Sequence, residues 1–148
     1  MVPKVIAPTD IHGDKNIKKQ NTFDKKGEQN MESRELALLA AKLLTNKKAL
    51  DVAVINIGVK SSFADYFVLA SGTTERQIAA LRDEIDDQFA KEGVIVKSIE
   101  GKQTSGWILM DYGDVIINIL TAEMRERYNI EKVWGDCEML QYEGGHHA

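Results

Sequence analysis

The stretch WILMDYGDVIINIL, residues 107 to 120, decides how this chain folds. Two apolar runs flank Gly113-Asp114, which predicts two antiparallel strands joined by a two-residue turn, with glycine supplying the positive φ that such turns need. A turn at Tyr112-Gly113 would instead set Asp111 opposite Asp114, and like charges facing each other across strands are destabilising. The sequence therefore predicts the Gly113-Asp114 turn.

This turn sorts the side chains of the hairpin onto two faces. The first face pairs Tyr112 with Val115, Met110 with Ile117, and Ile108 with Ile119. The second face pairs Asp111 with Ile116, Leu109 with Asn118, and Trp107 with Leu120. The first face suits a core, whereas the second combines apolar anchors with a few polar groups, a composition typical of protein interfaces.

Length and composition favour one soluble globular domain. The chain has 148 residues, of which 43% are hydrophobic and 28% are charged. Its single cysteine, Cys137, excludes an internal disulfide and a multi-cysteine zinc site, and it fits a reducing compartment. The sequence contains no apolar run of the roughly 20 residues that span a bilayer, and no apolar leader at its start. We therefore expect a cytoplasmic protein with no membrane partner.

Charge is unevenly distributed along the chain. Residues 1–30 contain six lysines and four acidic residues, a net charge of +2. Because the whole chain has a net charge of −4, residues 31–148 carry a net charge of −6. An acidic globular part argues against direct, sequence-specific nucleic-acid binding and mildly favours a basic partner. Solubility alone is an equally good explanation of the negative charge.

The pattern of apolar residues predicts an α/β (mixed α+β) fold, with one mixed sheet of about five strands and flanking helices in the order α-β-β-α-β-β-β-α. We expect a disordered tail at 1–30, a domain at 31–138 and a flexible tail at 139–148.

Helices are expected at 33–46, 74–91 and 122–128, capped by Ser33, Thr73 and Thr121. Strands are expected at 51–57, 65–70 and 94–99, besides the hairpin. The first two should be antiparallel, with 65–70 central, and the strands that flank helix 74–91 should form a parallel pair.

Catalytic constellations are not visible in the sequence. Asp65, Asp111 and Asp114 are the carboxylates placed on strands or turns, but Asp111 and Asp114 straddle the turn and do not project from one strand face as two-metal sites require. All three histidines, His12, His146 and His147, fall in the expected tails. We therefore predict that the protein is not an enzyme and needs no metal or cofactor. The segment 71–74 suits a turn and helix cap better than an anion site.

The Trp107 face permits two interpretations. Trp107, Leu109, Ile116 and Leu120 are either buried under a helix of the same chain, such as 122–134, or partly open to receive a partner. A covering helix would have to satisfy Asp111, and Arg125 or Arg127 is placed to do so. Pattern alone leaves this choice open.

Three segments together resemble the ribosomal silencing factor family, also called Iojap-like proteins. They are KSSFADYFVLASGTTERQ at 60–77, Glu100-Gly101, and WILMDYGDVIINILTAEMRERYNIEKVW at 107–134. The resemblance spans about residues 33–136. It implies a nucleotidyltransferase-like fold that lacks the catalytic residues of those enzymes.

The resemblance also implies a function. The expected role is to bind the large (50S) ribosomal subunit through its fourteenth protein, a basic protein, and to block joining of the small subunit when nutrients are scarce. The expected partner-binding residues are Trp107, Leu109, Asp111, Tyr112, Asp114, Ile116, Asn118, Leu120, Asp65, Tyr66 and Arg125. The chain departs from the family pattern at Asn118, usually His, and at Leu120, often Phe.

The sequence alone leaves two other functions and one oligomeric state open. One rival is a nucleotidyltransferase-like enzyme with a nucleotide near Ser71–Thr74 and Asp65, and the other is a factor for large-subunit assembly. A homodimer that covers the apolar hairpin face and competes with ribosome binding is also compatible with the sequence.

Overall fold

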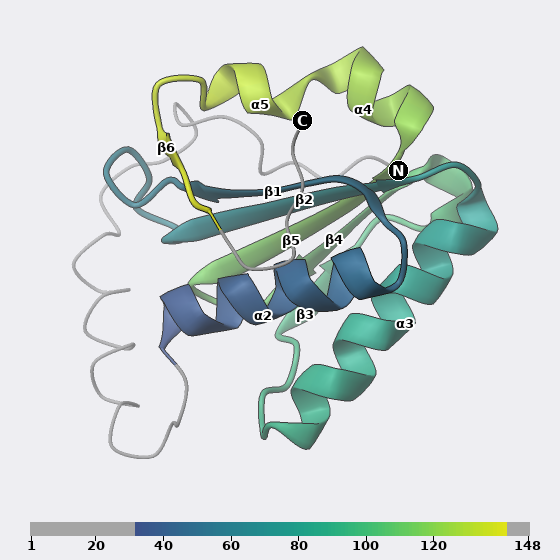
Figure 1. The fold of residues 1–148 in the computed structure, drawn as a ribbon, viewed down its shortest axis with the longest axis horizontal. Coiled ribbons are helices and arrows are strands. Elements are labelled where there is room, and N and C mark those ends of the chain that lie inside the picture. Colours follow the sequence, from purple (N-terminus) through teal and green to yellow (C-terminus); the bar gives the residue numbers. More distant parts are fainter. Residues whose placement is uncertain (1–31, 142–148) are drawn as a thin grey trace.

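The computed structural model describes residues 32–141, which form one six-stranded mixed sheet with helices on both faces (Figure 1). Residues 1–30, where we expected a tail, lie outside the described residues, as do residues 142–148. The elements are α2 (Ser33–Asn46), β1 (Leu50–Asn56), β2 (Tyr66–Gly72), α3 (Glu75–Lys91), β3 (Ser98–Glu100), a 3₁₀ turn η2 (Gln103–Ser105), β4 (Trp107–Asp111), β5 (Val115–Thr121), α4 (Ala122–Tyr128), α5 (Ile130–Val133) and β6 (Glu138–Met139). Within this range, no helix has the length and apolarity needed to cross a membrane.

The hairpin of β4 and β5 has the predicted register. Trp107 lies opposite Leu120, Leu109 opposite Asn118, and Asp111 opposite Ile116. The backbone N–H of Tyr112 donates to the carbonyl oxygen of Val115 at 3.0 Å and closes the turn. Gly113 has φ of 93°, a conformation that glycine adopts without steric cost.

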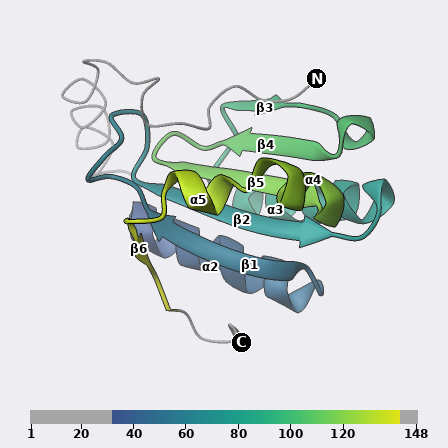
Figure 2. The same cartoon turned by 90° about the horizontal axis from the view of Figure 1, so that it is seen from above.

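The strand order is β3-β4-β5-β2-β1-β6. β1 and β2 pair antiparallel, as predicted, and β2 is central because β5 pairs with its other edge (Figure 2). The parallel pair is β2 with β5, not β2 with β3 as we expected from the strand–helix–strand order. β3 runs in the same direction as β2 but lies at the sheet edge, separated from it by the hairpin. β5 is buried along almost its whole length and β3 is exposed throughout, so β5 is the better neighbour for a buried strand.

Two apolar cores fill the space on the two faces of the sheet. On one face, α2 and α3 pack through apolar stripes, and the predicted α3 stripe of Ile78, Leu81, Ile85 and Phe89 is fully buried. On the other face, α4, α5 and the 57–65 loop cover a second cluster that includes Trp107 and Trp134. Figure 2 shows α4 and α5 lying over β5 and β2.

Two of the three predicted helix caps are wrong by one residue. Glu32, not Ser33, precedes the first turn of α2, and the Ser33 hydroxyl donates instead to Oδ2 of Asp65 at 3.4 Å. Thr74, not Thr73, caps α3 by accepting from the N–H of Gln77. Thr121 caps α4 as predicted, accepting from the N–H of Met124.

The C-terminal part contains a left-handed Asn129 and a short second helix, both of which the sequence predicts, and one strand, β6, that it does not. The left-handed conformation of Asn129, with φ of 43°, ends α4 and lets α5 begin at once in a new direction. β6 then pairs with β1 as a sixth strand instead of about five. Because β6 includes Met139 and Leu140 is buried, the fold continues past the boundary we expected at residue 138.

Candidate functional site

Three of the carboxylates singled out in the sequence meet at one end of the sheet. Asp65 precedes β2, Asp114 precedes β5, and Asp111 ends the antiparallel strand β4. The backbone N–H groups of Asp65 and Tyr66 donate to the carbonyl oxygen of Asp114 at 2.8 and 3.0 Å, so the two strand starts are side by side. All four residues are half-buried. We call Asp65, Tyr66, Asp111 and Asp114 the acidic end.

Local hydrogen bonds fix the carboxylates of the acidic end. Oδ1 of Asp111 accepts from the N–H of Gly113 at 2.8 Å, an Asx turn that holds this carboxylate against the hairpin turn. Oδ2 of Asp65 accepts from Ser33 at the start of α2. Among residues 32–141, the Lys97 side chain places a cation nearby, because it passes over Gly113. The acidic end therefore has a net charge of −2 even when Lys97 is counted.

The Trp107 face is closed, which corrects our expectation that its residues contact a partner. Trp107, Leu109, Ile116 and Leu120 are all buried, and Ile130 and Trp134 pack over them from α5 and the turn that follows it. The interpretation in which helices at 122–134 cover this face is confirmed. In this structure, these four residues form a core that supports the sheet and present no contact surface.

Tyr112 and Asn118 are buried as well. Tyr112 lies on the opposite face, where its ring packs edge-on against Phe89 with ring centres 4.7 Å apart. Burial raises the pKa of the Tyr112 phenol well above its usual value. Asn118 is fully buried and accepts, at its side-chain oxygen, the indole N–H of Trp107 at 3.0 Å. Neither side chain is placed to contact a partner.

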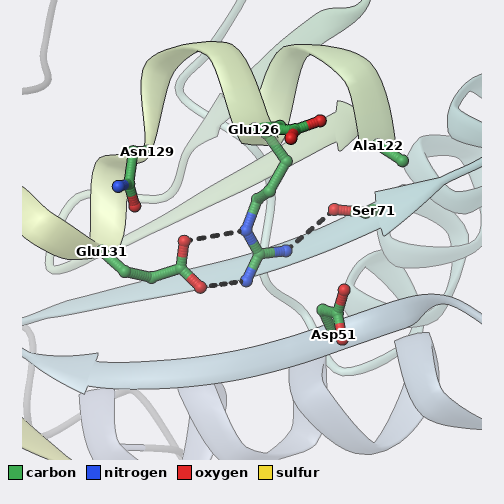
Figure 3. Close-up of a pocket in the computed structure, with 7 residues that line it drawn as sticks. Asp51, Ser71, Ala122, Glu126, Asn129 and Glu131 are labelled. Carbon is green, nitrogen blue, oxygen red and sulfur yellow. Dashed lines mark hydrogen bonds and ion pairs between the residues drawn. The ribbon is translucent and has the colours of Figure 1, made fainter.

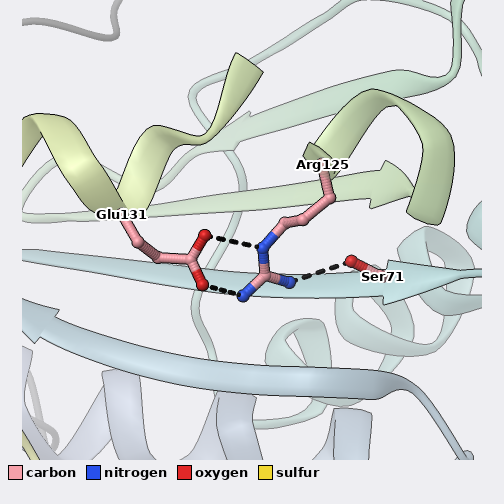
Figure 4. Close-up of polar contacts among 3 residues, drawn as sticks. All are labelled: Ser71, Arg125 and Glu131. Atoms are coloured by element: carbon pink, nitrogen blue, oxygen red, sulfur yellow. Dashed lines mark hydrogen bonds and ion pairs between the residues drawn. The ribbon is translucent and has the colours of Figure 1, made fainter. Parts of the chain in front are cut away.

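Arg125 does not pair with Asp111, contrary to our expectation for a covering helix. Its guanidinium instead donates two hydrogen bonds to the carboxylate of Glu131, at 3.1 and 2.6 Å, and one to Ser71 Oγ at 2.9 Å (Figure 4). The hydrogen bonds from Arg125 lower the pKa of Glu131. Because Arg125 lies on α4, Glu131 on α5 and Ser71 on β2, this clasp ties the two short helices to the sheet.

A pocket of about 330 Å³ adjoins the clasp and contains several charged side chains (Figure 3). Its lining residues are Asp51, Ser71, Ala122, Arg125, Glu126, Asn129 and Glu131. The three carboxylates and one guanidinium give it a net charge of −2. The pocket lies at the carboxyl ends of β2 and β5, at the end of the sheet opposite to the acidic end.

The nucleotide site that we considered is contradicted by this arrangement. Asp65 and Ser71 lie at opposite ends of β2, about 20 Å apart at the rise of an extended strand. The two halves of that site therefore do not meet. In residues 32–141, no group of three or more His, Cys, Asp or Glu side chains is arranged to hold a metal ion.

Cys137 is buried and directly follows Asp136, a residue that forms an ion pair. Lys60, in the loop between β1 and β2, pairs with Asp136 after α5. Burial raises the pKa of the Cys137 thiol, which disfavours the reactive thiolate. This agrees with a structural role for Cys137.

Sequence reasoning missed Glu131 and Asp51. Glu131 is six positions after Arg125, a spacing that brings side chains together here because the left-handed Asn129 interrupts the helix between them. Asp51 lies at an irregularity between Leu50 and Ala53 in the pairing of β1 with β2, and has φ of 48°. No periodic pattern in the sequence predicts the pairing of Arg125 with Glu131 or the irregular backbone at Asp51.

Comparisons with known proteins agree on one family. A family model described as "Ribosomal silencing factor during starvation" matches residues 30–147. Ribosomal silencing factor RsfS of Halalkalibacterium halodurans is 34% identical over 114 residues, covering 77% of this chain and 97% of the relative. The mouse protein "Mitochondrial assembly of ribosomal large subunit protein 1" is 33% identical over 96 residues, covering 62% of this chain and 42% of its own length. A crystal structure of a protein from Chromobacterium violaceum, 30% identical, matches with a TM-score of 0.68 over 71% of this chain and 88% of that one.

Proposed function

The chain belongs to the ribosomal silencing factor family, and we propose that it binds the large (50S) ribosomal subunit through its fourteenth protein and sterically blocks joining of the small subunit. Translation would then fall when nutrients are limiting. The protein would act in the cytoplasm, where ribosomes work. The relatives are named as silencing factors and not as enzymes, which points to a regulatory protein without turnover.

The observation that carries the proposal is the convergence of Asp65, Asp111 and Asp114 at one end of the sheet. Asp65 is far from the other two in the sequence, yet the parallel pairing of β2 with β5 brings all three together. Carboxylates form strong hydrogen bonds with arginine and lysine, the side chains that a basic partner presents. We therefore assign the docking surface to the acidic end.

The acidic end also has the rigidity that docking requires. Each of its carboxylates precedes or ends a strand, and the Asx turn at Gly113 restricts Asp111. A surface held in place by its own hydrogen bonds loses less conformational entropy on binding than a mobile loop does.

The homodimer is a weaker proposal after the fold is known. Its basis was an apolar hairpin face open for self-association, and that face is covered by α4 and α5. We therefore assign no role to the Trp107 face in assembly.

Cosedimentation with purified 50S subunits tests the docking surface. The variant Asp111→Asn with Asp114→Asn removes two charges, and the amide oxygen introduced at position 111 can still accept from the N–H of Gly113. We expect affinity to fall at least about tenfold, because close charge pairs at an interface each contribute about 1.5 kcal/mol or more. The matched control is Asp87→Asn, an exposed carboxylate on α3. Equal cosedimentation of the double variant and wild type would reject the acidic end as the docking surface.

A second function, in large-subunit assembly, is favoured by the mouse relative, whose name states that role. Both functions use a large-subunit partner, so binding does not separate them. Deletion of an assembly factor causes precursor particles of the large subunit to accumulate. A silencing factor leaves mature subunits that continue to join during starvation.

A further inference from the structure

The pocket beside Arg125 lies where the fold itself creates a crevice. β2 and β5 are parallel neighbours, but the chain leaves β2 into α3 on one face of the sheet and leaves β5 into α4 on the other. Such a switch point, outside the carboxyl ends of the strands, is where open α/β sheets usually bind ligands. At about 330 Å³, the pocket is large enough for a small molecule.

One wall of this pocket offers hydrogen-bond donors. A guanidinium has five N–H groups, and three of those on Arg125 are used by Glu131 and Ser71. The two that remain are on Nη1 and Nη2. Ser71 accepts from Arg125, and its own hydroxyl proton has no acceptor among the described residues. Arg125 and Ser71 are both more than nine-tenths buried, so the clasp holds these donors in fixed positions.

The side of the pocket formed by β1 offers an acceptor, the carboxylate of Asp51. Asp51, on β1, lines the pocket on the side away from α4, whereas Glu126 lies on α4 above the Arg125 side chain (Figure 3). In Figure 3, Asp51 lies across the pocket from Glu131, below Ser71. The irregular pairing at residues 50–53 and the left-handed backbone of Asp51 place this side chain at the pocket. Bulges of this kind often redirect a side chain next to a functional site.

We infer that this pocket binds a free α-amino acid. The ligand carboxylate would accept from Arg125 and Ser71, and its ammonium group would donate to Asp51. A phosphate or nucleotide suits the pocket poorly, because the net charge of the lining is −2. A simple amine would leave the spare donors of Arg125 without an acceptor. An α-amino acid supplies a carboxylate for Arg125 and Ser71 and an ammonium group for Asp51.

Thermal unfolding of the purified full chain with each L-amino acid in turn tests this inference without ribosomes, so the result is separate from that for ribosome binding. For at least one amino acid we expect the melting temperature to rise by about 5 °C at about ten times its Kd. Its α-amide, which lacks the carboxylate, and its α-hydroxy acid, which lacks the ammonium, should each give a much smaller shift.

The variant Asp51→Asn should weaken binding about tenfold, because it removes the charge that faces the ammonium group. Asp51 is exposed, so the variant should fold, and Asp87→Asn is again the matched control. Four results would each overturn the inference: no shift with any amino acid, equal shifts with the two analogues, unchanged binding by Asp51→Asn, or a shift with phosphate or nucleotides alone.

Discussion

Trp107 donates its indole N–H to the side-chain oxygen of Asn118 at 3.0 Å, inside a core where both residues are fully buried. This contact joins β4 to β5 on the face that α4 and α5 cover. Trp107 therefore stabilises the hairpin from within the core, at the end of β4 opposite to Asp111.

Replacing Trp107 should reduce stability and leave the binding surface intact. Trp107→Phe removes the donor to Asn118 and leaves a small cavity, so we expect a loss of about 2 kcal/mol in the free energy of unfolding. The double variant Trp107→Phe with Asn118→Leu should recover about 1 kcal/mol, because neither partner is then left polar and unsatisfied. Urea denaturation measures both values, and a double variant no more stable than Trp107→Phe would contradict this account.

The clasp of Arg125 and Glu131 should make stability depend on acid pH. Because the pKa of Glu131 is lowered in the folded state, its contribution is present above its ordinary value of 4.5 and is lost as pH falls through the folded pKa. Glu131→Gln should be less stable than wild type at neutral pH, and the difference should shrink as pH falls below 4.5. Melting temperatures measured across this range would show it, whereas a constant difference would exclude the clasp as the cause.

Tyr112 should respond to alkali in the opposite sense. Burial raises its pKa in the folded state, so the stabilisation is complete below the ordinary value of 10.0 and is lost as pH rises beyond it. Its hydroxyl is buried without a partner among the described residues. Tyr112→Phe should therefore change neutral-pH stability by less than about 1 kcal/mol and reduce the alkaline loss. A large loss at neutral pH would show that the hydroxyl is hydrogen-bonded.

Gly113 should tolerate substitution poorly. Its φ of 93° is costly for a residue with a Cβ, and that Cβ would lie 3.2 Å from Lys97 Nζ. Gly113→Ala should cost about 1–2 kcal/mol and weaken 50S binding beyond that, because it displaces the turn that fixes Asp111. Gly113→Asn should cost less, since asparagine tolerates positive φ better. Equal costs for the two variants would argue against backbone strain.

The hairpin was predictable because its signals are local. Glycine at position 113 and the like charges of Asp111 and Asp114 select one turn, and side-chain alternation then fixes the pairing along both strands. The α3 stripe was predictable for the same reason, because one helical period determines which residues face the core. Neither inference depended on distant parts of the chain.

Features that depend on distant contacts were not predictable. The choice of β5 over β3 as the parallel neighbour of β2 depends on burial along the full strand, which no sequence window reports. The same is true of the Trp107 face, because Ile130 and Trp134 reach it only after Asn129 turns the chain. The acidic end was indicated by the family resemblance, but its geometry required the sheet order.

Subunit joining tests the central claim most directly. Purified 30S and 50S subunits are mixed with the wild-type protein, with Asp111→Asn/Asp114→Asn, or with Asp87→Asn, and the 70S fraction is measured by sedimentation. We predict that wild type and Asp87→Asn reduce the 70S fraction equally and that the double variant reduces it much less. A double variant that blocks joining as well as wild type, or a wild-type protein that leaves joining unchanged, would contradict the account.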